Sequence, residues 1–267
     1  MLRDITIGQY YPADSVLHRL DPRVKLVSTL IYIISLFVFG SLIGYGVAAV
    51  FLASMIVISK VPFRFMVKGL KPIMVLLCIT LVFNLIFTPG KEVFSFWIIT
   101  VTEEGIALAV RMGIRLIFLI IGASLMTLTT TPNQLTDGLE RLLKPLNRIH
   151  VPVHEIAMIM SIALRFIPIL LDETDKIMKA QTARGADFES GGLIKKVKAM
   201  VPLLVPLFIS AFRRANDLAM AMEARCYHGG EGRTQMKPLV YKKRDYAAYA
   251  VVWAYLAVSI VFRVLGI

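Results

Sequence analysis

The chain has 267 residues, of which 57% are hydrophobic and 18% charged, and its formal net charge is +12. Soluble globular domains have about 45–50% apolar and about 25% charged residues, so this composition indicates a chain that lies largely in lipid. Two cysteines far apart in the sequence exclude a disulfide framework and a cysteine-based metal site. The positive charge by itself would suggest nucleic-acid binding, but its distribution along the chain favours a membrane protein without a nucleic-acid partner.

Five apolar stretches are predicted to span the membrane, and a spanning helix needs roughly 20 mostly apolar residues. The first 23 residues contain no apolar run, so we expect the first hydrophobic segment to act as an uncleaved insertion signal. The uncharged run from Leu26 to Ser59 is long enough for two spans, with a turn at Gly40, Gly44 and Gly46. The predicted spans are about Val24–Phe39, Ile43–Ile58, Pro72–Phe87, Ile106–Thr129 and Tyr246–Leu265.

Lysines and arginines are distributed unevenly over the connecting segments, and positive charge marks the cytoplasmic side of a membrane protein. Residues 1–25 and residues 60–71 hold four each, whereas the turn at 40–46 holds none and residues 88–105 hold one. Residues 131–245 hold eighteen, against twelve acidic residues. We therefore expect the N-terminus and the long charged segment at the cytoplasmic face and the C-terminus outside.

Two features lie near the predicted outer face. Val93–Val101 is too short to span and is predicted to be an external strand or an interfacial segment. Arg111 and Arg115 lie four residues apart on one face of the fourth span. They either extend toward the external headgroups or form a polar seam inside the bundle, and both interpretations stay open.

The segment after the fourth span is predicted to form three long helices at the cytoplasmic face. Thr131 and Gln134 have the spacing of a capping box, with leucines following at helical intervals. The second helix is predicted from about Pro152 to Asp187, and the third from about Leu193 to Arg225, with a break at Gly191-Gly192 between them. The predicted regions are residues 1–130 (four spans), 131–230 (the cytoplasmic-face helices) and 231–267 (the last span with its basic lead-in).

The second and third helices share one sequence plan. Each runs from an apolar part that contains proline to a polar part rich in small residues, and an offset of 41 places Arg184 on Arg225. One interpretation is that each arginine complements the partial negative charge of a helix C-terminus. The other is that both are presented outward as anchors for a partner that itself comes as a pair, because arginine is frequent among interface hot spots.

These residues resemble a known family, the transmembrane T-components of energy-coupling factor transporters, which import vitamins and transition-metal ions into prokaryotes. The likeness covers essentially the whole chain and includes Leu17–Leu26 (LHRLDPRVKL), Leu135–Glu140 (LTDGLE) and Ala163–Pro168 (ALRFIP). Its most specific part is the pair of motifs Ala183-Arg184-Gly185 and Ala224-Arg225-Cys226, in which Cys226 replaces the commoner glycine.

The resemblance implies that the cytoplasmic helices are coupling helices, whose arginines Arg184 and Arg225 dock into grooves on two ABC-type ATPases. A separate substrate-binding membrane S-component would pack against the chain, topple in the membrane when the ATPases move, and determine which substrate is imported. ATP and Mg²⁺ would be bound by the ATPases, and this chain would bind no cofactor. The resemblance also implies a prokaryotic cell membrane as the location.

Signals for catalysis in the chain itself are weak. It lacks a G-x-x-x-x-G-K-[ST] motif, a second histidine after His154-Glu155, and a G-x-S-x-G elbow, so we expect no enzyme activity, no catalytic residue and no metal site. Two alternatives from other classes stay open. One is a membrane-embedded enzyme that uses His154, Glu155 and Asp172, and the other is a secondary transporter that works alone.

Overall fold

The structure, a computed structural model, describes residues 10–39, 41–96, 99–186, 188, 192–230, 236 and 238–265. The predicted features at Gly40, Trp97, Asp187 and Gly191 lie outside these residues. Among them the regular secondary structure is helical apart from one two-stranded hairpin, which confirms the predicted all-α membrane fold. Contacts between residues divide the chain into two compact units. We call residues 10–139 and 239–265 the bundle unit and residues 140–238 the paired-helix unit.

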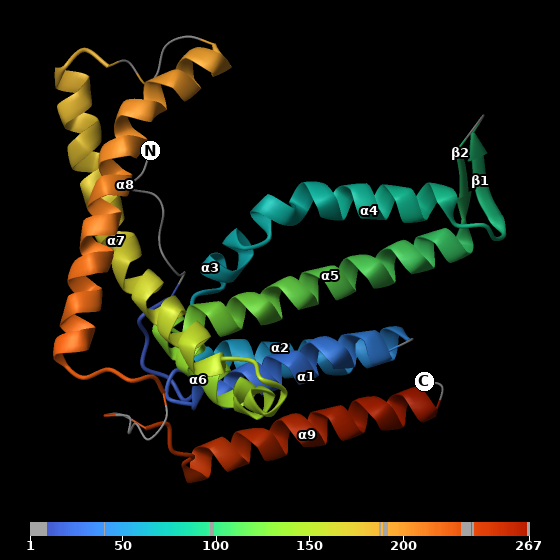
Figure 1. Cartoon of the computed structure of the whole chain (residues 1–267). Coiled ribbons are helices and arrows are strands. Elements are labelled where there is room, and N and C mark those ends of the chain that lie inside the picture. The colour runs from blue at the N-terminus through green and yellow to red at the C-terminus, as the bar shows by residue number, and fades with distance from the viewer. Residues whose placement is uncertain are drawn as a thin grey trace. The chain divides into compact units, whose positions relative to one another are not determined.

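The bundle unit is built from helices, and the long ones lie side by side (Figure 1). They are α1 (Pro22–Val38), α2 (Leu42–Ser59), α3 (Phe63–Lys68), the 3-10 helix η2 (Lys71–Ile73), α4 (Met74–Phe87), α5 (Glu103–Thr129) and α9 (Lys243–Val264). α1 packs against both α5 and α9, and α5 also packs against α2 and α4. The first helix of the chain therefore packs against the last helix and against α5 from the middle of the chain.

The connection between α1 and α2 has the predicted length but begins one residue earlier, at Phe39. Ser41 begins α2, and its hydroxyl accepts a hydrogen bond from the N–H of Gly44 at 3.3 Å. A side-chain oxygen at this position satisfies one of the free N–H groups of the first turn. Gly44 and Gly46 therefore lie inside α2, and the prediction that they form the turn was wrong, although the predicted helix pair is confirmed.

A hairpin connects α4 to α5, at the end of the two helices where α4 finishes and α5 begins (Figure 1). Its strands, β1 (Glu92–Phe96) and β2 (Ile99–Thr102), pair antiparallel. The strand prediction for this segment is thus confirmed. The side chain of Thr102 begins α5 by accepting a hydrogen bond from the N–H of Gly105 at 3.0 Å.

The number of membrane-spanning helices differs from the prediction of five. Among the described residues, four helical stretches are long and apolar enough to cross a membrane: Phe63–Phe87, Glu103–Thr129, Val153–Ala183 and Lys243–Val264. α1 and α2, with 17 and 18 residues, are shorter than the roughly 20 residues of a typical span. Val153–Ala183 was predicted at the cytoplasmic face, but its apolar first half gives it the length and hydropathy of a span.

The core of the bundle unit contains packed aromatic rings among its aliphatic side chains. Tyr255 of α9 stacks on Phe51 of α2 with ring centroids 4.1 Å apart, and its hydroxyl lies 2.9 Å from that of Ser35 on α1. Arg115 of α5 points inward, since its Nε donates a hydrogen bond to the Tyr45 hydroxyl at 2.9 Å. The structure therefore supports the polar seam for Arg115. Arg111 instead bonds the Ala107 carbonyl of its own helix at 3.2 Å.

Helix α6 (Pro132–Leu143) begins at the predicted capping box, which is confirmed in both directions. The N–H of Gln134 donates to the Thr131 hydroxyl at 3.3 Å, and the N–H of Thr131 donates to the Gln134 amide oxygen at 3.2 Å. The predicted leucine face is only partly buried, because Thr136 and Gly138 occupy the buried positions. A Cβ at Gly138 would lie 3.0 Å from Pro22 Cβ, which is tighter than ordinary van der Waals contact, so glycine favours this close approach to α1.

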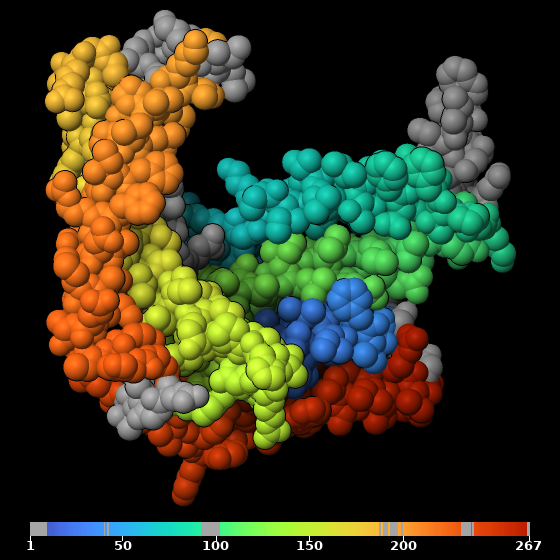
Figure 2. All heavy atoms as spheres, viewed as in Figure 1, coloured from blue at the N-terminus to red at the C-terminus, as the bar shows by residue number. Residues whose placement is uncertain are grey.

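The paired-helix unit contains the 3-10 helix η3 (Lys144–Ile149) and two long helices, α7 (Val153–Ala183) and α8 (Leu193–Ala224). Figure 2 shows the orange side chains of α8 lying against the yellow side chains of α7. The helices run antiparallel, because Glu173 bonds Ser210 whereas Gln181, further along α7, bonds the carbonyl of the earlier Pro202. α8 ends at Ala224, one residue before the predicted Arg225. α7 ends at Ala183, four residues before the predicted Asp187, because the turn at Arg184 and Gly185 stops the helix.

Candidate functional site

The C-terminus of α7 is closed by a tight turn of the backbone. Arg184 is the C-cap residue, and Gly185 follows in the left-handed region with φ +89°. The N–H of Gly185 bonds the Thr182 carbonyl at 2.9 Å, and the N–H of Ala186 bonds the Gln181 carbonyl at 3.0 Å. This is the Schellman arrangement, which satisfies carbonyls that a helix end leaves without partners and favours glycine at the left-handed position.

The C-terminus of α8 repeats this turn residue for residue. Arg225 is the C-cap residue and Cys226 is left-handed with φ +55°. The N–H of Cys226 bonds the Glu223 carbonyl at 2.8 Å, and the N–H of Tyr227 bonds the Met222 carbonyl at 3.1 Å. Each donor and each acceptor lies 41 positions after its counterpart on α7. The offset seen in the sequence therefore corresponds to one backbone geometry used twice.

The two turns present the arginine side chains to the surface. Arg184 and Arg225 are both exposed, and so are Ala183 and Ala224 beside them. The last carbonyls of each helix already receive hydrogen bonds from backbone N–H groups, including that of Arg184 to the Ala180 and Gln181 carbonyls. Neither guanidinium is needed to cap its helix, so both are free to meet a carboxylate, for which the rigid guanidinium fork is well suited.

A central ion pair sets the register of α7 against α8. The Glu173 carboxylate accepts hydrogen bonds from the Ser210 hydroxyl at 2.5 Å and from Nη2 of Arg214 at 2.6 Å. Glu173 lies eleven residues before Arg184, and Arg214 lies eleven residues before Arg225. At about 1.5 Å per helical residue, each exposed arginine is roughly 16 Å along its helix from this pair. Because the helices are antiparallel, the two motifs lie at opposite ends of the paired-helix unit.

A groove of about 620 Å³ lies beside the α8 motif. α7 contributes Arg165 together with apolar side chains, and the turn after α8 contributes Arg225 and His228. The antiparallel register explains this neighbourhood, because the start of α7 passes the end of α8. Arg165 belongs to the Ala163–Pro168 segment noted in the sequence, but sequence spacing gave no reason to place it near Arg225, sixty residues later.

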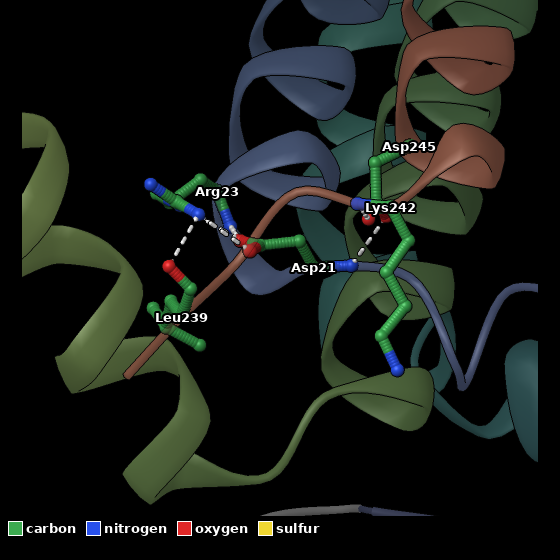
Figure 3. Close-up of polar contacts among 5 residues, drawn as sticks. All are labelled: Asp21, Arg23, Leu239, Lys242 and Asp245. Atoms are coloured by element: carbon green, nitrogen blue, oxygen red, sulfur yellow. Dashed lines mark hydrogen bonds and ion pairs between the residues drawn. The ribbon is translucent and has the colours of Figure 1, made fainter. Parts of the chain in front are cut away.

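The Leu17–Leu26 segment forms a polar junction at the start of α1 (Figure 3). The Asp21 carboxylate accepts hydrogen bonds from the backbone N–H of Arg23 at 2.9 Å and from its Nη2 at 2.7 Å. The same guanidinium donates to the Leu239 carbonyl at 3.2 Å and lies 3.8 Å from the centre of the Tyr241 ring. The segment that leads into α9 is thereby fixed to the first turn of α1.

Asp245 completes this junction from α9. It is 1% exposed, and its carboxylate accepts hydrogen bonds from the N–H of Asp21 at 2.9 Å and from the N–H of Lys242 at 2.7 Å (Figure 3). The bond to Lys242 caps α9, which explains why this helix begins before the predicted Tyr246. Sequence reasoning missed Asp245; the available signal was an acidic residue directly after three basic ones where a helix begins.

Lys25 connects the junction to the end of α5. Its ammonium group is buried and donates to the Thr129 carbonyl at 2.7 Å and to the His18 carbonyl at 3.2 Å. A positive charge at the C-terminus of a helix complements its partial negative charge. Thr129 ends α5, and Leu239 is where the chain re-enters the bundle unit after the paired-helix unit. Both are held by the Leu17–Leu26 segment.

Two groups of this junction have shifted pKa values. Burial opposes ionisation of Asp21, but the hydrogen bonds from Arg23 outweigh it, so the pKa of Asp21 lies below its ordinary value of 3.8. Burial lowers the pKa of His18 below its ordinary 6.5, although the hydrogen bond to the Tyr11 carbonyl opposes this shift. At neutral pH the junction therefore contains an ionised aspartate and a neutral histidine.

The residues considered for catalysis do not form one constellation. Nδ1 of His154 lies 2.8 Å from the Glu140 carboxylate, and the ring packs against Gly230. Glu155 is exposed, and Asp172 is eighteen residues from His154 on the same helix, which is about 27 Å. Within the described ranges, no cluster of three or more His, Cys, Asp or Glu side chains could hold a metal ion.

Comparison with known proteins identifies the family. A family model described as "CbiQ: Cobalt transport protein" matches residues 13–236. A Clostridium kluyveri protein named "Energy-coupling factor transporter transmembrane protein EcfT" is 57% identical over 266 residues, 99% of this chain and 98% of that protein. Proteins with the same name from Acidaminococcus fermentans and Bacillus subtilis are 52% and 47% identical, covering 92% of this chain and 91% and 93% of their own lengths. The chain therefore belongs to the family of energy-coupling factor transporter transmembrane components.

Proposed function

We propose that this chain couples ATP hydrolysis by two ABC-type ATPases to the import of a vitamin or a transition-metal ion. The Ala183-Arg184-Gly185 and Ala224-Arg225-Cys226 motifs each dock one ATPase, and α7 and α8 act as the coupling helices. A substrate-binding S-component in the membrane receives the movement and selects the substrate. The chain itself is non-catalytic and binds no cofactor, because ATP and Mg²⁺ belong to the ATPases.

The observation on which this proposal depends is the duplicated helix end. Two exposed arginines each lie in a Schellman turn of the same geometry. They are at equal helical distances from the Glu173–Arg214 pair and at opposite ends of an antiparallel helix pair. Two equivalent anchors suit a partner that consists of two related subunits. Membership in the transporter family supports the same assignment.

The rest of the proposal concerns placement in the cell membrane. The N-terminus and the helix ends with Arg184 and Arg225 face the cytoplasm, where ATP is available, and the C-terminus is external. The distribution of lysine and arginine over the connecting segments supports this orientation. The alternative of a membrane enzyme is not favoured, because His154 and Asp172 are far apart along α7.

Replacement of both arginines tests the proposal. The Arg184→Ala, Arg225→Ala double variant should abolish ATP-driven uptake and release the ATPases during purification, because loss of one partner of an interface charge pair costs about 2–5 kcal/mol. Arg→Lys at both positions should restore only part of the uptake, because the bidentate geometry is lost. Arg148→Ala is the matched control, since this arginine is also exposed in the paired-helix unit. Full uptake by the double alanine variant would refute the docking role.

A further inference from the structure

The groove beside the α8 motif contains two arginines and no acidic residue. Twelve residues line it, and they include Arg165, Arg225 and His228 but no Asp or Glu. Both arginines are exposed, and among the described residues neither forms an ion pair. Like charges that share a groove repel each other, and an anionic occupant converts this repulsion into attraction.

The remaining lining is mostly apolar. Met158, Ile162 and Phe166 of α7 face Leu218 and Met222 of α8 across the groove. A surface of this kind binds a segment that offers an apolar stripe together with carboxylates. Methionine-rich apolar surfaces also tolerate movement of the bound segment, because the thioether side chain adapts its shape.

The two ends of the helix pair differ in whether a second arginine accompanies the arginine of the motif. The offset of 41 that relates Arg184 to Arg225 relates Arg165 of α7 to Pro206 of α8. The position that supplies a second arginine beside Arg225 thus supplies an uncharged proline in the other half of the repeat. The backbone turns are equivalent, but the surroundings of the two anchors are not.

We propose that Arg165 and Arg225 together form a two-arginine docking groove, which takes an acidic, partly apolar segment of one ATPase subunit. This inference rests on the proposed function and adds a residue outside both motifs. The inference also implies that the end of α8, with two arginines, binds carboxylates more strongly than the end of α7, with Arg184 alone. An acidic peptide matches the two arginines by charge, and apolar side chains beside its carboxylates match the lining from α7 and α8. An anionic lipid is the competing occupant that the crosslinking experiment distinguishes.

Photo-crosslinking in the assembled transporter tests the occupant. A photoreactive amino acid is placed at position 165, 184, 225 or 163, one position at a time, in complexes purified with their own ATPases. Ala163 is the control, because it is exposed on another face of α7. Positions 165 and 225 should form adducts with the same ATPase subunit, within a peptide that contains Asp or Glu, whereas position 163 should not.

Binding measurements give a second criterion. Arg165→Ala should weaken ATPase binding about tenfold or more at moderate salt, with Arg165→Lys intermediate and Arg148→Ala unchanged, and high salt should reduce these differences. Wild-type affinity for Arg165→Ala, or a lipid adduct at position 165, would overturn the two-arginine groove. An ATPase adduct at position 225 would in that case still support the proposed docking of the ATPase at Arg225. Absence of ATPase adducts at both 184 and 225 would instead overturn the proposed function.

Discussion

Glu173 of α7 and Arg214 of α8 form a salt bridge at structurally equivalent positions of the two helices. One carboxylate oxygen accepts hydrogen bonds from Nε of Arg214 at 3.1 Å and from Nη2 at 2.6 Å. The two residues lie 41 positions apart, the same offset that relates Arg184 to Arg225. In an antiparallel pair, contact between equivalent positions marks the centre of the repeat, so this salt bridge fixes both anchors at matching distances from one point.

The first prediction concerns this salt bridge. Glu173→Gln or Arg214→Ala should reduce ATP-driven uptake severalfold, because α7 and α8 lose the contact that fixes their register. The cost in stability should be small, since the pair is partly exposed to solvent. Uptake by proteoliposomes and thermal unfolding in detergent measure the two effects separately.

The charge-reversed double variant, Glu173→Arg with Arg214→Glu, serves as the control. It should recover more uptake than either single reversal, because attraction across the helix pair is restored. Single variants with normal uptake would show that the register of α7 and α8 does not depend on this pair.

The second prediction concerns the left-handed residue after each arginine. Cys226→Gly should raise the free energy of unfolding by up to about 1 kcal/mol and preserve uptake, because the left-handed conformation disfavours residues with a Cβ. Gly185→Ala should lower it by about 1 kcal/mol, although a Cβ there would meet no atom within 4 Å. Thermal unfolding of the purified variants provides the measurement. Equal stability of wild type and Cys226→Gly would contradict the strain argument.

The third prediction concerns pH and the junction at α1. The folded-state pKa of Asp21 lies below 3.8, so its ion pair with Arg23 stabilises the fold fully above this ordinary value and loses that contribution as the pH falls through the folded-state pKa. Asp21→Asn keeps a capping side chain but loses the charge, at a cost of about 1.5–3 kcal/mol near neutral pH.

Unfolding curves measured from about pH 6 down to about pH 3 should therefore converge for wild type and Asp21→Asn as the acid protonates. A constant difference across this range would show that the charge of Asp21 does not stabilise the junction.

Asp245→Ala should also destabilise the protein, by about 1–3 kcal/mol, because it leaves the N–H groups of Asp21 and Lys242 without their acceptor. Thermal unfolding of the purified variant measures this loss.

Much of the local structure was predictable from the sequence. Apolar length and periodicity predicted the helices, and the Thr131–Gln134 spacing predicted a capping box that the structure contains. The paired Ala-Arg-small motifs predicted two equivalent helix ends. Each helix and each helix end depends on residues within one or two helical turns of each other, so the local sequence is sufficient to specify it.

Contacts between distant segments could be decided only by the packed helices. Asp245 meets Asp21 across 224 positions, and Arg165 shares a groove with Arg225 because α7 and α8 pack antiparallel in one register. Hydropathy predicts which residues are buried but not which residues they contact. For this reason the leucine face was predicted to be the buried face of α6, whereas Thr136 and Gly138 are the residues that are buried. The sequence by itself determined most of the helices, the capping box at Thr131 and the repeated Ala-Arg-small motifs. The tertiary structure decided which polar side chains lie together, because that depends on the packing of whole helices.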